Sequence, residues 1–189
     1  RNEKPGPGRF REFLQFDADV IGTENLLADA ELCVLISEIL EKCGLDEKDY
    51  TVKISTRKLT DDLFKNLKIL SREQILTSQR ALDKIDRLGW EEVKKLLGKG
   101  RKDKSGDYTK GANLNNDQIK EIESTLEGKN PDKEDIKEIL SIFDAYDFKN
   151  YKYDPTIIRG LEYYTGPIFE VDLNFEVKNS KGQAIQFGS

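Results

Sequence analysis

Two segments near opposite ends of the chain alternate between two kinds of side chain, and this pattern constrains the fold most. Residues 9–20 and residues 167–177 both have the period of two that a β-strand imposes on its side chains. The intervening stretch, from residue 57 to residue 148, is mostly helical in its spacing. The sequence therefore predicts strands near both ends of the chain and helices between them, which is an α+β pattern.

The first of these segments predicts a β-hairpin over residues 1–21, because Pro5-Gly6-Pro7-Gly8 is a turn sequence. One face of the strand that follows has cations nearest the turn, an aromatic ring in the middle, and an amide and carboxylates farther along. Its members are Arg9, Arg11, Phe13, Gln15, Asp17 and Asp19. Such a face could hold a polyphosphate, stack a base and bind an amine. The alternative is a solvated face with cross-strand ion pairs.

The C-terminal segment predicts a half-buried antiparallel strand over residues 167–177, a turn over 178–182 and a returning strand over 183–187. Just before it, Arg159 stands beside Gly160 and offers a guanidinium where the backbone can approach closely. Tyr164 adds a phenol in a turn next to glycine. A surface arginine and a core tyrosine are the alternative interpretation of these two residues.

The middle of the chain predicts a core helix from Thr23 to Cys43, ended by Gly44, and a short strand over residues 50–55. Further helices are expected over residues 60–69, 72–87, 90–97, 115–127 and 132–146. Asn115 and Asp132 are the expected caps of the last two helices.

Residues 94–110 depart from the acidity of the chain, whose formal net charge is −5. This glycine-rich segment holds seven Lys or Arg residues and two Asp residues, so it predicts a cationic loop. Such a loop is a candidate for contact with a phosphate backbone, and a solvated surface loop is the alternative.

Composition excludes several classes of chemistry. With no His, the chain can form neither a zinc–histidine site nor a Ser-His-Asp triad, and we predict no metal site. No apolar stretch approaches the ~20 residues of a membrane span. Cys33 and Cys43 fit neither a disulfide framework nor a CxxC pair, which favours a reducing compartment. The absence of Met predicts that the chain is a fragment of a longer protein.

Both ends of the chain resemble one family. Residues 1–17 (RNEKPGPGRFREFLQFD) resemble the second signature motif of class II aminoacyl-tRNA synthetases. Residues 159–166 (RGLEYYTG), with Phe169-Glu170, are similar to the histidine-specific motif of histidyl-tRNA synthetases. Residues 101–114 also resemble the insertion region of certain bacterial forms, so the resemblance covers nearly the whole chain.

This resemblance implies part of the class II antiparallel β-sheet with flanking helices, interrupted by an all-helical insertion domain. The expected domains are residues 1–58 and 151–189 for the catalytic part and residues 59–150 for the insertion. The parent enzyme would join histidine to ATP, with Mg²⁺ bound to the nucleotide, and transfer the histidine to tRNA(His). It would act as a cytoplasmic homodimer that does not enter a membrane, and the fragment alone is expected to be inactive.

The resemblance also implies roles for individual residues. Arg1 and Arg159 would be catalytic. ATP would be bound by Arg1, Glu3, Arg9, Arg11, Phe13 and Arg159, and histidine by Arg1, Gln15, Asp19, Arg159, Tyr163 and Tyr164. The candidates for tRNA contact are Lys99, Arg101, Lys102, Lys104 and Lys110.

Two departures from the family pattern are Glu162, where many members have Asp, and Asp19, which is shorter than the Glu of many bacterial enzymes. Two alternatives stay open. One is a synthetase-like regulatory subunit of ATP phosphoribosyltransferase, which usually lacks the insertion and an intact RGLEYYTG-type motif. The other is a non-catalytic tRNA-binding module.

Overall fold

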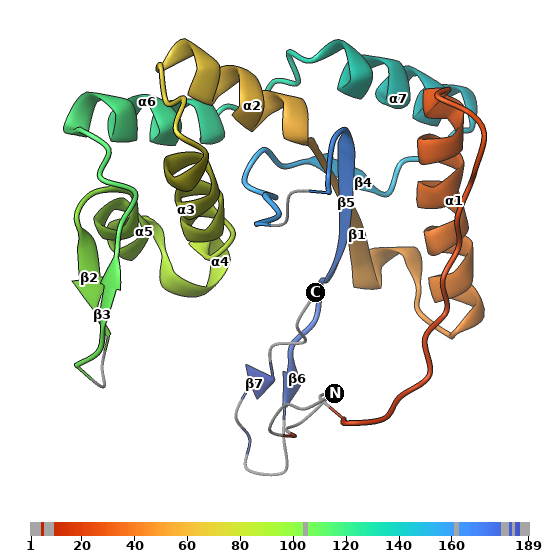
Figure 1. The fold of residues 1–189 in the computed structure, drawn as a ribbon. Helices are drawn as coiled ribbons and strands as arrows, with labels where there is room; N and C mark the ends of the chain where they lie inside the picture. The colour runs from red at the N-terminus through yellow and green to blue at the C-terminus, as the bar shows by residue number, and fades with distance from the viewer. Residues whose placement is uncertain are drawn as a thin grey trace.

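The structure is a computed structural model that describes Pro5, residues 10–103, 106–160 and 163–178, Gly182 and residues 184–185. In this part of the chain, a small sheet with two covering helices adjoins a second group of helices (Figure 1). The fold is therefore a mixture of α and β elements, as the alternation and the helical spacing predict.

The main sheet has three strands in the order β4-β1-β5. β1 (Tyr50–Thr56) lies in the middle, parallel to β4 (Tyr151–Tyr153) and antiparallel to β5 (Pro167–Leu173). The predicted strand over residues 50–55 is thus confirmed, but the sheet is mixed and not purely antiparallel. The parallel pairing follows from the long helical connection between β1 and β4, which returns the chain in the same direction.

One face of this sheet packs on α1 (Leu26–Lys42) and α7 (Glu134–Ala145). The buried side chains of this sheet core are Ala30, Cys33, Tyr50, Val52, Ile54, Ile136, Ile139 and Phe143. α1 begins later than the predicted Thr23, because the side chain of Asn25 caps it by accepting from the Leu27 N–H at 2.9 Å. α7 falls within the range predicted for the insertion, yet its apolar face belongs to the sheet core.

The second group of helices, called here the helical module, has its own core. It contains α2 (Arg57–Asn66), α3 (Arg72–Leu82), α4 (Ile85–Leu88), α5 (Trp90–Leu97) and α6 (Asn116–Leu126). Its buried residues include Leu59, Leu63, Phe64, Leu82, Val93, Leu97, Ile122 and Leu126, joined by Ile158 from beyond α7. The predicted helix over 72–87 is divided here into α3 and α4. The domain boundaries at residues 58 and 150 stay a prediction.

The capping predictions have mixed outcomes. Asn115 caps α6, and Gln118 completes a capping box by accepting from the Asn115 N–H at 3.0 Å. The prediction that Asp132 caps α7 is wrong, because the N-cap of this helix is Lys133, without a side-chain capping bond. The Asp132 carboxylate instead lies 3.9 Å from the Lys133 ammonium.

The predicted cationic loop contains a β-hairpin, so the insertion is not all-helical. β2 (Gly100–Lys102) pairs with β3 (Tyr108–Lys110) in antiparallel register. Next to this hairpin, the backbone at Gly111 passes close to the backbone at Gly98. Only a glycine fits at position 111, because a Cβ there would lie 2.2 Å from the carbonyl oxygen of Gly98.

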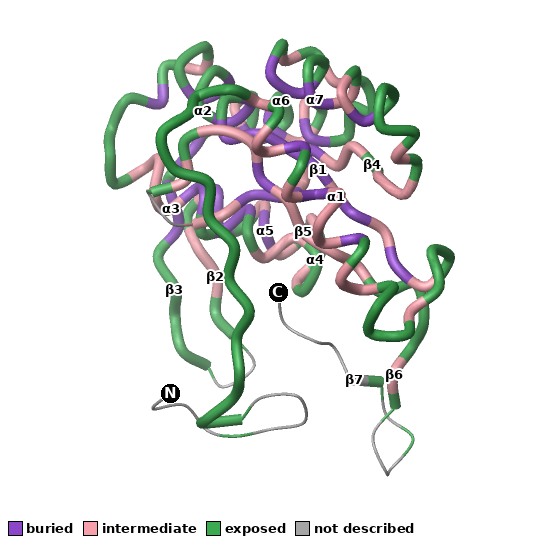
Figure 2. The backbone as a smooth tube through the Cα atoms, turned by 90° about the vertical axis from the view of Figure 1, so that its right-hand side faces the viewer, coloured by how far each residue is buried: buried purple, intermediate pink, exposed green. Residues whose placement is uncertain are grey.

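The predicted N-terminal hairpin does not form in the described residues. Residues 10–21 have no strand and run along the surface, and Leu14 is fully exposed (Figure 2). Alternation makes a segment suitable for a strand, but a strand also needs a partner for its backbone N–H and C=O groups. None of the strands described here pairs with residues 10–21. The predicted turn over residues 5–8 lies mostly outside the described residues.

The C-terminal strand is shorter than the predicted range of 167–177. β5 ends at Leu173 because Asn174 turns back, with its Nδ2 donating to the carbonyl oxygens of Lys48 and Tyr50, each at 3.0 Å. Beyond the break, β6 (Val177–Lys178) pairs with β7 (Ala184–Ile185). The predicted returning strand is therefore confirmed at residues 184–185. Among the described helices, none combines the length and the apolar character needed to span a membrane.

Candidate functional site

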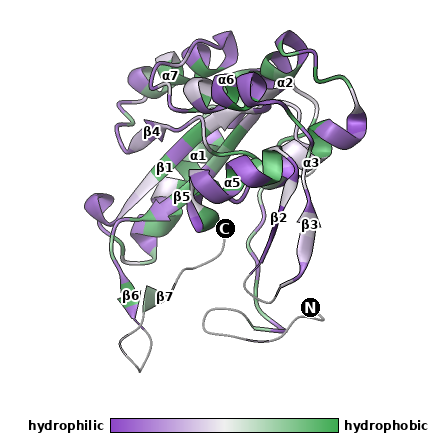
Figure 3. Ribbon diagram, turned by 90° about the vertical axis from the view of Figure 1, so that its left-hand side faces the viewer, coloured by the Kyte–Doolittle hydropathy of each residue, from purple (hydrophilic) through white to green (hydrophobic). Residues whose placement is uncertain are grey.

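The face of the main sheet opposite α1 and α7 carries charged side chains. Hydrophobic and hydrophilic residues alternate along β1 and β5 (Figure 3), so Val52 and Ile54 enter the sheet core while Lys53 lies on the other face. Lys53 is in register with Glu170 on β5. We call this surface the polar face, and it is defined by Lys53, Asp154, Arg159, Glu170 and Asp172.

Lys53 is the central charge of the polar face. Its Nζ lies 2.6 Å from Oδ2 of Asp172 and 3.2 Å from Oδ2 of Asp154, and only 15% of its side chain is exposed. Burial alone would lower the pKa of Lys53, but the hydrogen bonds to Asp172 and Asp154 outweigh it and raise that pKa. Lys53 is therefore a fixed cation at neutral pH.

Asp154 links the polar face to the segment that follows β4. Its Oδ1 accepts from the backbone N–H of Thr156 at 3.1 Å and from the Thr156 hydroxyl at 2.5 Å. Burial would raise the pKa of Asp154, but the hydrogen bonds from Thr156 and Lys53 together lower it. The carboxylate thus starts the turn that leads to Arg159 and stays ionised.

Arg159 and Tyr164 lie in the connection between β4 and β5. Nη2 of Arg159 is 3.2 Å from Oε2 of Glu170, which fixes the guanidinium beside the polar face. The Tyr164 ring stacks on the exposed ring of Tyr163, with centroids 4.8 Å apart. Burial first, and then the Tyr163 hydroxyl, raises the pKa of Tyr164. Its phenol is therefore neutral at pH 7 and can donate one hydrogen bond.

The residues predicted from the N-terminal motif have a different location. Arg11, Phe13, Gln15 and Asp19 belong to the exposed segment over residues 10–21. Within that segment, Gln15 Nε2 donates to Asp17 at 3.5 Å. In Figure 1 the segment runs alongside α1 in the right-hand part of the view, whereas the connection between β4 and β5 lies to the left of β5. The structure thus brings Arg159 and Tyr164 close to the polar face, but not the segment over residues 10–21. Arg1, Glu3 and Arg9 lie outside the described residues.

Sequence reasoning missed Lys53 and Asp154. Lys53 is a single charge between Val52 and Ile54 in a strand that is otherwise easy to recognise. This alternation indicates that Lys53 lies on the face of the sheet opposite Val52 and Ile54. It does not indicate that Asp172 and Asp154 form ion pairs with Lys53, because those pairs depend on how distant strands align.

The β2–β3 hairpin has fewer cations outside ion pairs than its composition suggests. Nη1 of Arg101 lies 2.8 Å from Glu92, and Nζ of Lys110 lies 3.1 Å from Glu73. Lys99 and Lys102 are exposed, and no ion pair is found for either in the described part of the chain. Beside them, Tyr108 is 59% exposed and donates its hydroxyl proton to the carbonyl oxygen of Lys99 at 2.6 Å. Lys104, the remaining candidate, is not among the described residues.

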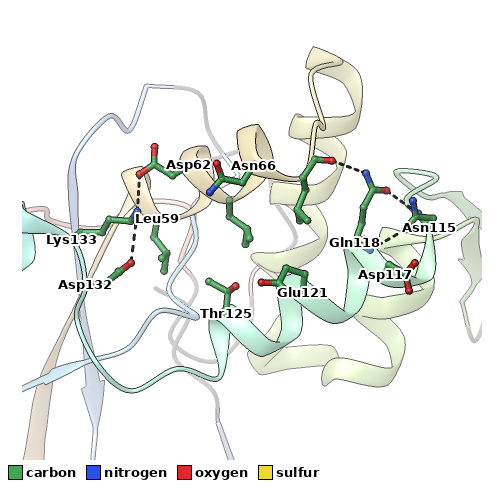
Figure 4. Close-up of a pocket in the computed structure, with 12 residues that line it drawn as sticks. Leu59, Asp62, Asn66, Asn115, Asp117, Gln118, Glu121, Thr125, Asp132 and Lys133 are labelled. Atoms are coloured by element: carbon green, nitrogen blue, oxygen red, sulfur yellow. Dashed lines mark hydrogen bonds and ion pairs between the residues drawn. The ribbon is translucent and has the colours of Figure 1, made fainter.

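A groove of about 630 Å³ lies elsewhere, between α2 and α6 (Figure 4). Its apolar lining residues are Leu59, Leu63 and Leu67, and its charged ones are Asp62, Asp117, Glu121, Asp132 and Lys133. At one end Lys133 donates to Asp62 at 2.7 Å, and this hydrogen bond lowers the pKa of Asp62. With four carboxylates and one ammonium, the groove repels phosphate groups. It contains none of the predicted site residues. Across the described ranges, no group of three or more His, Cys, Asp or Glu residues could hold a metal ion.

Comparisons with known proteins agree on one family. A family model described as histidyl-tRNA synthetase matches residues 1–174. The whole chain aligns with the histidine–tRNA ligases of Bartonella quintana and Rhizobium meliloti, each at 42% identity, and covers 43% and 42% of their lengths. The chain therefore spans less than half of the length of these relatives.

Solved structures show the same fold. The crystal structure of histidyl-tRNA synthetase from Nostoc sp. PCC 7120 matches with a TM-score of 0.64 and 22% identity, over 80% of this chain and 37% of that one. A Bacillus halodurans protein described as an ATP phosphoribosyltransferase regulatory subunit/histidyl-tRNA synthetase matches with a TM-score of 0.57 and 20% identity. That alignment covers 81% of this chain and 40% of the other.

Proposed function

Because this chain belongs to the histidyl-tRNA synthetase family, we propose that it is the central part of an enzyme that activates histidine and transfers it to tRNA(His). The observation that carries this proposal is the alignment of the whole chain with histidine–tRNA ligases at 42% identity, the segment over residues 159–166 included. Since the chain covers 43% of the length of such a relative, the activity is assigned to a longer polypeptide. The chain alone is expected to be inactive.

The first reaction, between histidine and ATP, requires the two substrates to be aligned and does not require a base to remove a proton. A carboxylate oxygen of histidine attacks the α-phosphorus of ATP, a new P–O bond forms, and the bond to the bridging oxygen breaks to release pyrophosphate. The histidine carboxylate is already ionised at pH 7, so no proton has to be removed from it. What the protein supplies is positioning and fixed positive charge where negative charge accumulates.

Arg159 suits that role. A guanidinium does not titrate near neutral pH, and its planar donors can hold two oxygens at once. Glu170, 3.2 Å away, orients this side chain before the substrates arrive. We assign Arg159 to the α-phosphate and the histidine carboxylate. Tyr164, with its neutral phenol, is assigned to the histidine imidazole, and Tyr163, whose ring stacks on that of Tyr164, is assigned to the same contact.

The remaining substrate contacts are assigned to the N-terminal motif. Arg1, Glu3, Arg9, Arg11 and Phe13 would bind ATP, with Arg1 also at the histidine carboxylate. Gln15 and Asp19 would hold the histidine. These assignments require residues 10–21 to move from the exposed path described above and to form a strand beside the polar face in the longer polypeptide. The continuous alignment of the family model from residue 1 supports them.

We expect Mg²⁺ to enter with ATP. This ion usually keeps several waters and binds through substrate phosphates and few carboxylates. The polar face offers carboxylates that are already paired with Lys53 and Arg159, so it does not form a dedicated cage for the ion.

The tRNA is assigned to the β2–β3 hairpin. Lys99 and Lys102 are the available cations there, with Arg101, Lys104 and Lys110 as further candidates, and Tyr108 can stack on an unpaired base. The acidic groove between α2 and α6 excludes the phosphate backbone from the other side of the helical module. A homodimer and a cytoplasmic location complete the proposal by analogy with the family.

A regulatory subunit of ATP phosphoribosyltransferase is the second candidate, favoured only by the likeness to the Bacillus halodurans structure. The intact sequence at residues 159–166 favours the synthetase. To separate the two, ATP–pyrophosphate exchange by the full-length protein can be measured with each amino acid in turn. Stimulation by histidine alone is expected. Absence of histidine-dependent exchange would refute the proposal.

A further inference from the structure

Arg57 is a buried arginine that the proposed chemistry does not use. It is the first residue of α2, directly after β1, and is only 7% exposed. Its Nε donates to Oδ1 of Asp61 one turn later on the same helix, at 2.9 Å. Asp61 is itself about half exposed, so the pair orients the guanidinium without burying a second charge.

This residue contacts both ends of the segment that carries the histidine-specific motif. Nη1 of Arg57 donates to the carbonyl oxygen of Arg159 at 3.3 Å. The backbone N–H of Arg57 donates to the carbonyl oxygen of Gly166 at 2.9 Å. A single residue therefore closes the segment from residue 159 to residue 166 into a loop with fixed ends.

The helical module provides a second support at the start of this loop. A Cβ on Gly160 would lie 3.2 Å from Cγ and 3.4 Å from Cα of Arg80, so the backbone of the loop packs directly on α3. Ile158, just before it, is buried in the core of the helical module. The backbone of Arg159 is thus held from the side of the helical module, while its guanidinium reaches Glu170 on β5.

We propose that Arg57 is a positioning residue, which clamps both ends of the 159–166 loop so that the Arg159 guanidinium stays aligned on the polar face. This inference rests on the role proposed above for Arg159. It makes the junction between β1 and α2 part of the catalytic apparatus, although Arg57 itself touches no substrate.

The test uses three variants of the full-length protein. Arg57→Met removes the guanidinium donors and keeps a long side chain. Asp61→Asn removes the charge that orients the guanidinium, at a site exposed enough to leave folding intact. Lys65→Met is the control, because Lys65 is an exposed cation on the same helix. Amide hydrogen exchange of residue 57, whose backbone N–H donates to the Gly166 carbonyl oxygen, is measured beside the kcat and KM of histidine-dependent ATP–pyrophosphate exchange.

We expect Arg57→Met to speed exchange of the residue 57 amide, which donates to the Gly166 carbonyl oxygen, by roughly tenfold or more. The reason is that loss of the guanidinium bond to the Arg159 carbonyl oxygen releases one end of the loop. Its kcat should fall by up to about 100-fold, as for a small misalignment of a catalytic group, with smaller changes in KM. Asp61→Asn should show the same changes to a smaller extent, and Lys65→Met should match the wild type. Unchanged amide exchange in both Arg57→Met and Asp61→Asn would overturn the clamp. An inactive wild type would instead refute the proposed function, and the exchange data would still decide the clamp.

Discussion

Nη2 of Arg159 lies 3.2 Å from Oε2 of Glu170, and this ion pair joins the loop after β4 to the polar face of β5. Both side chains are largely shielded, with 21% and 17% of their surfaces exposed. The pair therefore constrains where the guanidinium can point more than an exposed surface pair would. A substrate oxygen arriving at this face meets a cation whose orientation is already set.

Arg159→Ala should slow adenylate formation by at least ~10²–10³-fold, which is the usual loss when one preorganised donor is removed. The dissociation constants for histidine and ATP should change less, because other groups share the binding. Rapid-quench measurement of a single turnover in the full-length protein separates the two effects. Near-normal pyrophosphate exchange by the variant would refute the role of Arg159.

Phe143→Ala tests whether α7 stabilises the sheet. Phe143 is fully buried and lies 4.9 Å, between ring centroids, from both Phe148 and Tyr151. Removing the ring should destabilise the sheet core by about 3–5 kcal/mol. Hydrogen exchange of the β1 amides reports this change directly. Tyr146→Ala, at the exposed end of the same helix, is the control, and an equal effect of both variants would contradict the packing described here.

Asp154 predicts how stability changes in acid. Its pKa is lowered in the folded protein, below the ordinary 3.8, so the unfolded state binds protons first as the pH falls. The stability that Asp154 contributes is therefore complete well above pH 3.8 and declines as the pH drops through that value. Urea unfolding at a series of acidic pH values should show a shallower decline in Asp154→Asn than in the wild type. Asp144→Asn, at an exposed site, should keep the wild-type slope, and a wild-type slope in Asp154→Asn would contradict the prediction.

Lys99 and Lys102 predict the salt dependence of tRNA binding. If each neutralises one phosphate, the double variant Lys99→Gln with Lys102→Gln should weaken tRNA binding. It should also reduce the slope of log K against log salt by up to roughly two units. Titration of tRNA(His) at several salt concentrations measures both quantities. Lys65→Gln is the matched control, and an unchanged slope in the double variant would remove the hairpin from the tRNA site.

Local signals predicted much of this fold. Asn115 and Gln118 predict the start of α6 from the sequence alone, because a capping box depends only on residues within one turn of the helix. The strand over 50–55 and the helix over 90–97 follow from short-range periodicity in the same way, whereas the helix predicted over 60–69 begins earlier and is found at Arg57–Asn66. The motif resemblance points to Arg159 and Tyr164, and both lie in the connection between β4 and β5.

Features set by distant contacts were not predictable in this way. The spacing of Ile136, Ile139 and Phe143 reveals an apolar helix face but not that this face covers the sheet and not the helical module. The N-terminal alternation likewise indicates a strand without supplying the partner that a strand needs. The sequence around Arg57 does not indicate its proposed positioning role, because that role depends on hydrogen bonds to two carbonyl groups about a hundred residues away.

The proposed function requires the polar face and the 159–166 loop to hold activated histidine. Calorimetric titration of a non-hydrolysable histidyl-adenylate analogue into the full-length protein tests this most directly, with Arg159→Ala and Lys65→Ala compared at equal concentration. The wild type and Lys65→Ala should bind equally well, and Arg159→Ala should bind roughly 10–100-fold more weakly, as expected for loss of charge-assisted hydrogen bonds. Equal affinity of Arg159→Ala and the wild type for the analogue would show that Arg159 does not contact activated histidine.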